Sequence, residues 1–182
     1  MTKNMNKDIS TMLLTEDEIR EKVHSLGAQI SEDYEGKNPI LICVLRGAFM
    51  FLADLIRNIT VPMEIEFLSI SSYGNEVKSS GEITIRSKIK RDLKDRHLII
   101  VEDIVDSGLS IEYLENYLEK FEPESIAKCI LLDKPEAHLK DFKIEYKGFH
   151  VGNEFLVGYG LDYAEKYRNL PYIGVLKKEI YS

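Results

Sequence analysis

The stretch of sequence that decides the fold is Leu98-Ile99-Ile100-Val101-Glu102-Asp103-Ile104-Val105-Asp106-Ser107-Gly108-Leu109-Ser110. Its first four residues are apolar and predict a strand that is buried on both faces, as in a parallel sheet. Two adjacent carboxylates follow, where we expect this strand to end. A short loop containing glycine and serine comes next, and a helical pattern begins after it.

The chemistry of this stretch indicates a bound phosphorylated sugar. Ligands of open α/β sheets bind at the carboxyl ends of the strands. A Gly/Ser-rich turn that leads into a helix offers backbone N–H groups and a positive dipole end to a phosphate. Because carboxylates beside an anion site need a cation or sugar hydroxyls between them, we expect Mg²⁺ there as well. Taken alone, the acidic residues also fit a solvated loop or the phosphoacceptor pocket of a receiver-type signalling domain.

The composition is that of a globular domain with an acidic surface. The chain has 182 residues, of which 44% are hydrophobic and 30% charged, and its net charge is −7. This fits one domain with a substantial core and argues against non-specific nucleic-acid binding. No apolar run approaches the roughly 18–20 residues that cross a bilayer, and Met1–Thr11 lacks the apolar stretch of a secretory signal. Cys43 and Cys129 lie in apolar runs and are expected to be reduced core residues of a cytoplasmic protein.

Alternating strand and helix patterns predict a parallel sheet with right-handed crossovers. Thr15 and Glu18 form a capping-box pattern, and apolar residues at 19, 23, 26 and 30 then define one helical face. The other expected elements are strands at 39–45, 63–71, 98–101 and 126–132, helices at 48–59 and 111–121, and short strand-like pieces near 147–151, 154–159 and 172–176. We expect one domain, 1–182, with a core at about 36–140 and a hood formed by the N-terminal segment and about 141–182.

Further segments are candidates for ligand binding, although each also has a plainer explanation. Leu45-Arg46-Gly47 ends a strand and opens a helix, so it is either a second anion site or a turn with an exposed Arg. The polar stretch 72–81 is long enough to be a lid or a disordered loop. From their positions in the sequence alone, Lys134 and Arg168 would be solvated surface residues. The segment 155–163 reads on its own as a core strand that ends in a turn.

Taken in order, these segments resemble the type I phosphoribosyltransferases, and among them the bacterial hypoxanthine-guanine phosphoribosyltransferases. The resemblance extends from about Thr15 to the end of the chain and rests on Leu45-Arg46-Gly47, Ser72-Tyr73-Gly74, Glu102–Gly108, Asp133-Lys134-Pro135, Phe155–Tyr163 and Tyr167–Gly174. One departure is Ser110, where Thr is common in the family; serine keeps the hydroxyl. The resemblance implies an α/β fold with a parallel twisted sheet flanked by helices and a small hood from the chain ends.

The resemblance also implies a role for each residue of the phosphate motif. Asp106 is expected to handle the proton at N7 of a purine, while Glu102 and Asp103 hold the ribose hydroxyls and Mg²⁺. The loop that is expected to wrap the 5′-phosphate consists of Ser107, Gly108, Leu109 and Ser110.

The remaining roles implied by the resemblance concern the diphosphate, the lid and the purine. Arg46, Gly47 and Arg168 are expected to bind diphosphate, with a cis peptide between Leu45 and Arg46, and Ser72 and Tyr73 to belong to the lid. The expected purine site comprises Ile104, Lys134, Phe155, Leu156 and Asp162. Lys134 is expected to bond to the 6-oxo group and Phe155 to stack on the ring. Asp162 is also an expected metal ligand.

The activity implied by the resemblance is purine salvage by Mg²⁺-dependent transfer of phosphoribosyl from 5-phosphoribosyl 1-diphosphate to N9 of hypoxanthine or guanine. The products are IMP or GMP and diphosphate. We expect a homodimer or homotetramer with small-molecule substrates and no nucleic-acid or membrane partner. Two alternatives stay open: a preference for xanthine, and a regulatory protein that binds nucleotide or RNA without catalysis. The presence of Asp106, Lys134 and Arg168 disfavours a loss of catalysis, and the acidic balance disfavours RNA.

Overall fold

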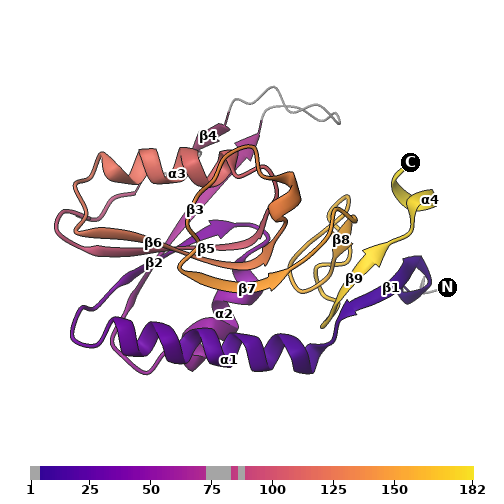
Figure 1. Ribbon diagram of the computed structural model, residues 1–182, viewed down its shortest axis with the longest axis horizontal. Coiled ribbons are helices and arrows are strands. Elements are labelled where there is room, and N and C mark those ends of the chain that lie inside the picture. Colours follow the sequence, from indigo (N-terminus) through magenta and orange to yellow (C-terminus); the bar gives the residue numbers. More distant parts are fainter. Residues whose placement is uncertain (1–4, 73–82, 86–88) are drawn as a thin grey trace.

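The computed structural model describes residues 5–72, 83–85 and 89–182, and its elements form a large sheet with helices on both faces and a small sheet at one end (Figure 1). The large sheet has six strands in the order β4-β3-β2-β5-β6-β7. Its strands are β2 (Ile40–Leu45), β3 (Glu64–Ser72), β4 (Ile83–Ile85), β5 (His97–Val105), β6 (Ser125–Asp133) and β7 (Tyr146–His150). All neighbours pair in parallel except β4, which is antiparallel to β3. The predicted parallel sheet flanked by helices is therefore confirmed.

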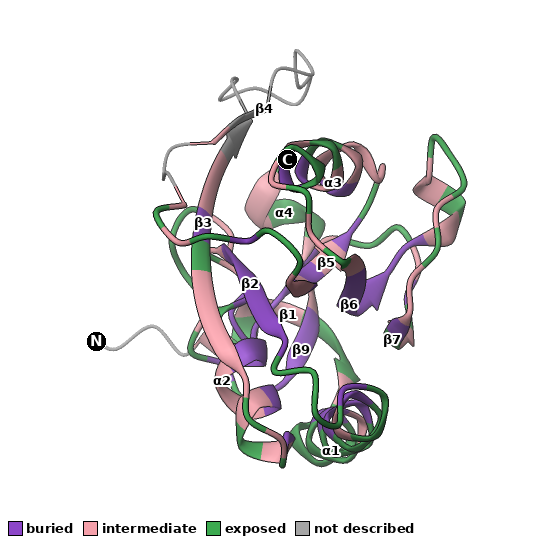
Figure 2. Cartoon of the chain, turned by 90° about the vertical axis from the view of Figure 1, so that its left-hand side faces the viewer, coloured by how far each residue is buried: buried purple, intermediate pink, exposed green. Residues whose placement is uncertain are grey.

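The helices cover the sheet from both sides, which explains the continuous apolar runs of the central strands. Helices α1 (Glu16–Asp33) and α2 (Phe49–Asn58) lie on one face and α3 (Leu109–Glu119) on the other (Figure 1). Figure 2 shows β2 and β6 almost wholly in the colour of buried residues. A strand that is covered on both faces has no solvent-facing positions, so it does not alternate between apolar and polar residues.

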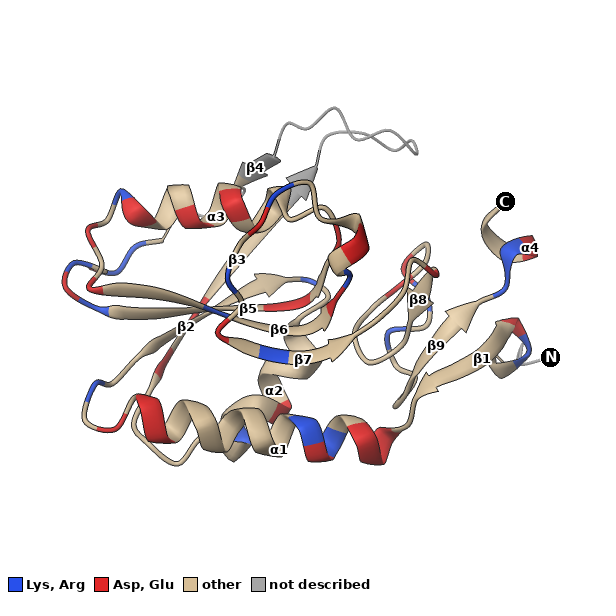
Figure 3. Cartoon of the chain, viewed as in Figure 1, with Lys and Arg blue, Asp and Glu red and all other residues tan. Residues whose placement is uncertain are grey.

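Helix α1 begins at the predicted capping box. The backbone N–H of Glu18 donates to the Thr15 hydroxyl at 3.3 Å, and the Thr15 N–H donates to the Glu18 carboxylate at 2.8 Å. The first turn is acidic (Figure 3), which complements the positive end of the helix dipole. The predicted apolar face is confirmed, because the buried residues of this helix are Ile19, Val23, Leu26, Gly27 and Ile30.

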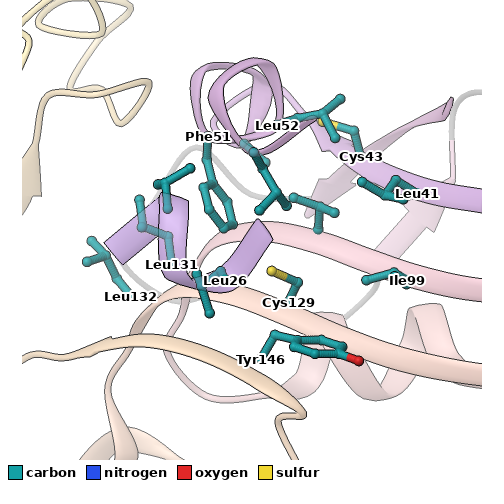
Figure 4. Close-up of a cluster of buried hydrophobic side chains, with 14 of the residues drawn as sticks. Leu26, Leu41, Cys43, Phe51, Leu52, Ile99, Cys129, Leu131, Leu132 and Tyr146 are labelled. Atoms are coloured by element: carbon teal, nitrogen blue, oxygen red, sulfur yellow. The ribbon is translucent and has the colours of Figure 1, made fainter. Parts of the chain in front are cut away.

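The main core lies between the sheet and the helices α1 and α2. Figure 4 shows Leu26 of α1 and Phe51 of α2 packed towards Cys43 and Cys129 of the strands. Both cysteines are free and buried, as predicted. Burial raises the pKa of the Cys43 thiol to about 12 and that of Cys129 further, so both remain uncharged thiols at neutral pH.

The chain ends meet in the small sheet, which we call the hood together with the loop between β8 and β9. It consists of β1 (Ile9–Leu14), β9 (Ile173–Leu176) and β8 (Leu156–Val157), paired antiparallel in that order. The flanking short elements are η1 (Met5–Asp8) and α4 (Lys178–Tyr181), and η2 (Pro135–Ala137) follows β6. Helix α1 and strand β7 come from segments that were expected in the hood. Helix α1 instead packs on the large sheet, and β7 pairs with β6 and extends that sheet.

Two predicted boundaries at the phosphate motif are wrong. Strand β5 does not end before the carboxylates but continues to Val105, because Glu102, Ile104 and Val105 are still paired with β6. Helix α3 begins at Leu109, two residues before the predicted start at 111. The acidic pair therefore lies within the sheet, where the backbone of β6 fixes its position.

The expected lid falls largely outside the described residues. Tyr73 and the rest of 73–81 are not described, and Ser72 is described only as the last backbone position of β3. Within the described residues, no helix is long and apolar enough to cross a membrane.

Candidate active site

The loop between β5 and α3 forms a small pocket at the carboxyl edge of the sheet. Gly108 caps α3 in a left-handed conformation, with φ at +82°, and a Cβ there would lie 2.4 Å from the ring of Phe142. Only glycine fits this turn. The cavity measures about 110 Å³ and is lined by Glu102, Ile104, Val105, Asp106, Ser107, Gly108, Ser110 and Ile111. The structure thus brings together most of the residues predicted to hold the phosphorylated sugar.

The acidic pair beside this pocket is desolvated. Asp103 is only 8% exposed, and the Oε2 atom of Glu102 is buried without a hydrogen-bond partner among the described residues. Burial raises the pKa of the Asp103 carboxyl to about 6, against the N–H of Ile104, which lowers it. Burial and the neighbouring Asp103 raise the pKa of Glu102 well above its usual value. Carboxylates in such surroundings favour a cation or hydroxyl donors as partners.

Three segments far apart in the sequence meet at this acidic pair. A Cβ on Gly47 would lie 1.6 Å from Oδ2 of Asp103, and a Cβ on Gly160 would lie 2.2 Å from the carbonyl oxygen of Gly47. The loop after β2, the end of β5 and the hood loop are therefore in direct contact. The expected cis peptide between Leu45 and Arg46 is present.

Arg168 is held in the hood loop with its guanidinium close to the acidic pair. Its Nη2 lies 2.8 Å from Oδ1 of Asp162, and its Nη1 donates to the carbonyl oxygen of Gly160 at 2.7 Å. The charges of both residues act on Asp103, because Arg168 lowers its pKa and Asp162 raises it. The predicted diphosphate and metal residues of the hood thus lie within electrostatic range of the β5 carboxylates.

Glu165 links the two arginines that were predicted to bind diphosphate. Its carboxylate lies 2.5 Å from Nη2 of Arg46 and 3.5 Å from Nη2 of Arg168. Sequence reasoning did not single out Glu165, since nothing in its spacing shows that these arginines converge. The structure therefore brings Arg46, Gly47 and Arg168 to one place and adds an acidic residue between the two cations.

Lys134 is the buried cation of the site. The residue is 7% exposed, its Nζ donates to the carbonyl oxygen of Glu154 at 3.1 Å, and the same atom lies 3.8 Å from Oδ2 of Asp106. The Asp106 side chain is 66% exposed. Lys134 is therefore not the solvated strand-end residue of the plainer interpretation, and it stands beside the expected proton-handling group.

The aromatic part of the expected purine site lies in the hood. The ring of Phe155 stacks on Tyr181 at 4.8 Å and meets the edge of Tyr163 at 5.6 Å. Leu156 is buried in β8, and its neighbour Phe155 accepts a backbone hydrogen bond from Leu176. The stacking partner Tyr181, near the end of the chain, was not anticipated from the sequence.

A buried ionic cluster supports the segment after Lys134. Asp133 is fully buried, with its carboxylate 2.8 Å from Nε2 of His138 and 2.7 Å from Nζ of Lys147. The ring of His138 lies 4.5 Å from that of Phe142, which closes over Gly108. The sequence gives no sign of this cluster, because His138 and Lys147 belong to separate segments that meet at Asp133 only in the fold.

The carboxylates fit a metal ion that is shared with a ligand. Among the residues described, no group of three or more His, Cys, Asp or Glu side chains could hold a metal alone. Glu102, Asp103 and Asp162 still supply oxygen donors, and the Oε2 atom of Glu102 has no partner among the described residues. Mg²⁺ is usually bound by one or two carboxylates together with substrate phosphates, so this donor set fits it.

Comparison with known proteins identifies relatives over the whole chain. Residues 10–164 match the model of the phosphoribosyl transferase domain. A hypoxanthine-guanine phosphoribosyltransferase of Streptococcus pneumoniae is 46% identical over 178 residues, which are 98% of this chain and 99% of that protein. The bifunctional protein TilS/HprT of Listeria monocytogenes is 45% identical over 179 residues, and the chain spans only 28% of its length. The crystal structure of a hypoxanthine phosphoribosyltransferase from Staphylococcus aureus superposes with a TM-score of 0.94 at 39% identity, covering 100% of this chain and 99% of that one.

Proposed function

The chain belongs to the phosphoribosyl transferase domain family, and we propose that it transfers phosphoribosyl from 5-phosphoribosyl 1-diphosphate to N9 of hypoxanthine or guanine. The products are IMP or GMP and diphosphate, which makes the reaction a step of purine salvage. One observation carries the assignment: the loop from Asp106 to Ser110 shares its pocket with Glu102, the neighbour of the desolvated Asp103, and Asp106 lies 3.8 Å from the buried Lys134. The loop suits a phosphate, the carboxylates suit ribose hydroxyls, and Lys134 suits a purine.

In this proposal the sugar phosphate occupies the pocket before α3. The backbone N–H groups of the loop Ser107, Gly108, Leu109 and Ser110 surround the 5′-phosphate at the positive end of the helix. Glu102 and Asp103 accept hydrogen bonds from the ribose hydroxyls, which would satisfy the unpartnered Oε2 of Glu102.

The divalent ion of the proposal is Mg²⁺, held by Asp103, Glu102 or Asp162 together with oxygens of the donor. Bound there, Mg²⁺ would supply positive charge that stabilises the leaving diphosphate. Arg168, Arg46 and the backbone of Gly47 bind the diphosphate as negative charge develops on it. Positioning and charge stabilisation of this kind supply most of the catalysis when a sugar passes through a cation-like state.

The purine is oriented by Lys134 and Phe155. The Lys134 ammonium has three donors and no acceptor, so it bonds to a 6-oxo oxygen and disfavours the 6-amino group of adenine. Phe155 stacks on the ring, the backbone of Leu156 contacts its edge, and Ile104 borders the sugar pocket. Asp106, exposed beside Lys134, accepts or returns the proton at N7 as N9 attacks C1 of the ribose.

The proposal extends to the state of the whole chain. We propose a single domain, 1–182, that works in the cytoplasm as a homodimer or homotetramer without a nucleic-acid or membrane partner. Its net charge of −7 disfavours the binding of a polyanion such as nucleic acid. Two large apolar side chains are exposed on one side of the sheet: Phe67 is 46% exposed and Phe49, in α2, is 40% exposed. Phe67 lies on the same side as α2, because it is the register partner of Cys43. Light scattering after size-exclusion chromatography measures the subunit number.

A steady-state assay tests the proposed function. The protein is incubated with 5-phosphoribosyl 1-diphosphate, Mg²⁺ and each of hypoxanthine, guanine, xanthine and adenine, and nucleotide and diphosphate are both quantified. We expect equal amounts of nucleotide and diphosphate with hypoxanthine or guanine and little product with adenine. Failure to use any 6-oxopurine would contradict the proposal and favour a regulatory nucleotide-binding protein.

A further inference from the structure

The hood loop that carries Arg168 contains a tyrosine in a strained conformation. Gly158, Tyr159 and Gly160 have φ values of +100°, +49° and +99°. Left-handed backbone is ordinary for glycine but uncommon for a residue with a Cβ. The backbone N–H of Tyr159 donates to the carbonyl oxygen of Leu170 at 2.8 Å, and that of Gly160 donates to Arg168 at 2.9 Å. The surroundings therefore hold Tyr159 in a conformation that the residue does not prefer.

The side chain of Tyr159 connects the hood to helix α2. The residue is 5% exposed, and its hydroxyl donates to Oδ2 of Asp54 at 2.7 Å across 105 residues of sequence. Burial and the Asp54 carboxylate raise the pKa of the phenol, so it keeps its proton and acts as a donor at every physiological pH. The phenol therefore stays a hydrogen-bond donor, and its bond to Asp54 links the hood loop to α2.

The two segments joined by this link carry or adjoin residues of the proposed diphosphate site. Helix α2 directly follows the loop with Gly47, whose carbonyl oxygen contacts Gly160. The carbonyl oxygen of Gly160 in turn accepts the hydrogen bond from Arg168. A shift of the Tyr159 loop away from α2 would therefore separate Arg168 from Gly47.

We infer that Tyr159 and Asp54 are positioning residues that fix the distance between Arg168 and Gly47 and so set the affinity for the diphosphate part of the donor. The inference rests on the proposed function. Tyr159 and Asp54 act through the backbone of Gly160 and of α2. Their loss should weaken donor and diphosphate binding while the purine site around Lys134 keeps its geometry.

Removal of the Tyr159 hydroxyl does not strand a buried charge. The Asp54 side chain is 46% exposed and lies 3.0 Å from Nη1 of Arg57. Asp54 and Tyr159 also line a cavity of about 280 Å³ between α1, α2 and the hood. Water can therefore replace the phenol as the partner of Asp54, and we expect Tyr159→Phe to fold.

The chain offers a matched control in Tyr146. This residue is also 5% exposed, and its hydroxyl also donates to an aspartate, Oδ2 of Asp33, at 2.7 Å. It joins the first residue of β7 to the last residue of α1, just before the chain enters the amino end of β2. Tyr146→Phe removes the same kind of hydrogen bond from the fold without touching the site.

The experiment compares wild type, Tyr159→Phe, Asp54→Ala, their double variant and Tyr146→Phe. For each we measure kcat, the KM values for 5-phosphoribosyl 1-diphosphate and hypoxanthine, the inhibition constant of inorganic diphosphate, and the Tm. One lost hydrogen bond should raise the donor KM and the diphosphate inhibition constant about three- to tenfold in Tyr159→Phe, with hypoxanthine KM and kcat within about twofold. Asp54→Ala should match it, and the double variant should add little, because each change removes the same bond.

The outcomes separate the inference from the proposed function. A purely structural role predicts that Tyr159→Phe behaves like Tyr146→Phe, with a lower Tm and unchanged donor KM, and that result would overturn the inference alone. Equal increases in the donor and hypoxanthine KM values, or additive effects in the double variant, would overturn it as well. Absence of turnover in the wild type would overturn the proposed function and this inference with it.

Discussion

Replacement of Lys134 by methionine should reduce the preference for 6-oxopurines without disturbing the donor site. Lys134→Met keeps the apolar stem and removes the ammonium, whose contacts are the carbonyl oxygen of Glu154 and the carboxylate of Asp106. Asp106 is 66% exposed and can be solvated by water instead. Under the proposed function, the main loss is therefore the charged hydrogen bond to the purine oxygen.

The size of the effect follows from the kind of bond that is lost. A hydrogen bond to a charged group contributes about 1.5–3 kcal/mol, so kcat/KM for hypoxanthine should fall about 10- to 150-fold. The preference for hypoxanthine over adenine should narrow by a similar factor, because the variant no longer sets an ammonium against the 6-amino group. The KM for 5-phosphoribosyl 1-diphosphate should change little.

The assay is a comparison of kcat/KM for hypoxanthine, guanine and adenine at saturating donor. Lys128→Met is the matched control, since Lys128 in β6 is, like Lys134, a buried lysine of the described residues, with a side chain 5% exposed and Nζ 2.6 Å from Glu115. We expect this control to lose stability but to keep its base preference. An unchanged ratio of hypoxanthine to adenine in Lys134→Met, or an equal change in Lys128→Met, would refute the assignment of Lys134.

Three further changes test other parts of the site. Asp106→Asn should lower kcat by about 10²- to 10⁴-fold, because the amide cannot take a proton, and should leave the donor KM nearly unchanged; steady-state kinetics check this, and a full kcat would remove Asp106 from the role. Gly47→Ala would place a methyl group 1.6 Å from Oδ2 of Asp103. The resulting displacement of residue 47 and Asp103 should lower kcat/KM for the donor by roughly 10²-fold. Circular dichroism should show a folded protein. Chelation of divalent ions should abolish turnover and added Mg²⁺ should restore it, since Glu102 and Asp103 would otherwise repel the donor's phosphates; activity in excess chelator would speak against the metal.

The parts of the site that are contiguous in sequence could be predicted from it. The loop from Asp106 to Ser110 is a strand–turn–helix unit whose geometry depends on neighbouring residues, and Gly108 occupies the left-handed position that the turn requires. Helix α1 was equally predictable, because its cap and its apolar face are both local patterns. Two boundaries were misplaced. The end of β5 was set too early, since the pairing of Glu102 with β6 is not visible locally, and α3 begins two residues before its predicted start.

The contacts that join distant segments could not be predicted. Strand β1 has mostly exposed side chains and pairs with β9 at the other end of the chain. Its sequence therefore shows no alternation of apolar and polar residues that would mark a strand. Glu165 and Tyr159 act on residues more than 100 positions away, and their spacing gives no hint of these partners. The proposed roles of Arg168 and Lys134 come from the family resemblance, since their positions in the sequence alone would have made both solvated residues.

The most direct test is a crystal structure with hypoxanthine, Mg²⁺ and a non-hydrolysable analogue of 5-phosphoribosyl 1-diphosphate. We predict the 5′-phosphate at the backbone N–H groups of residues 107–110, the diphosphate between Gly47 and Arg168, and the 6-oxo oxygen at hydrogen-bond distance, about 2.7–3.2 Å, from Nζ of Lys134. A sugar phosphate bound outside the β5–α3 loop, or a purine bound away from Lys134, would contradict the proposed site.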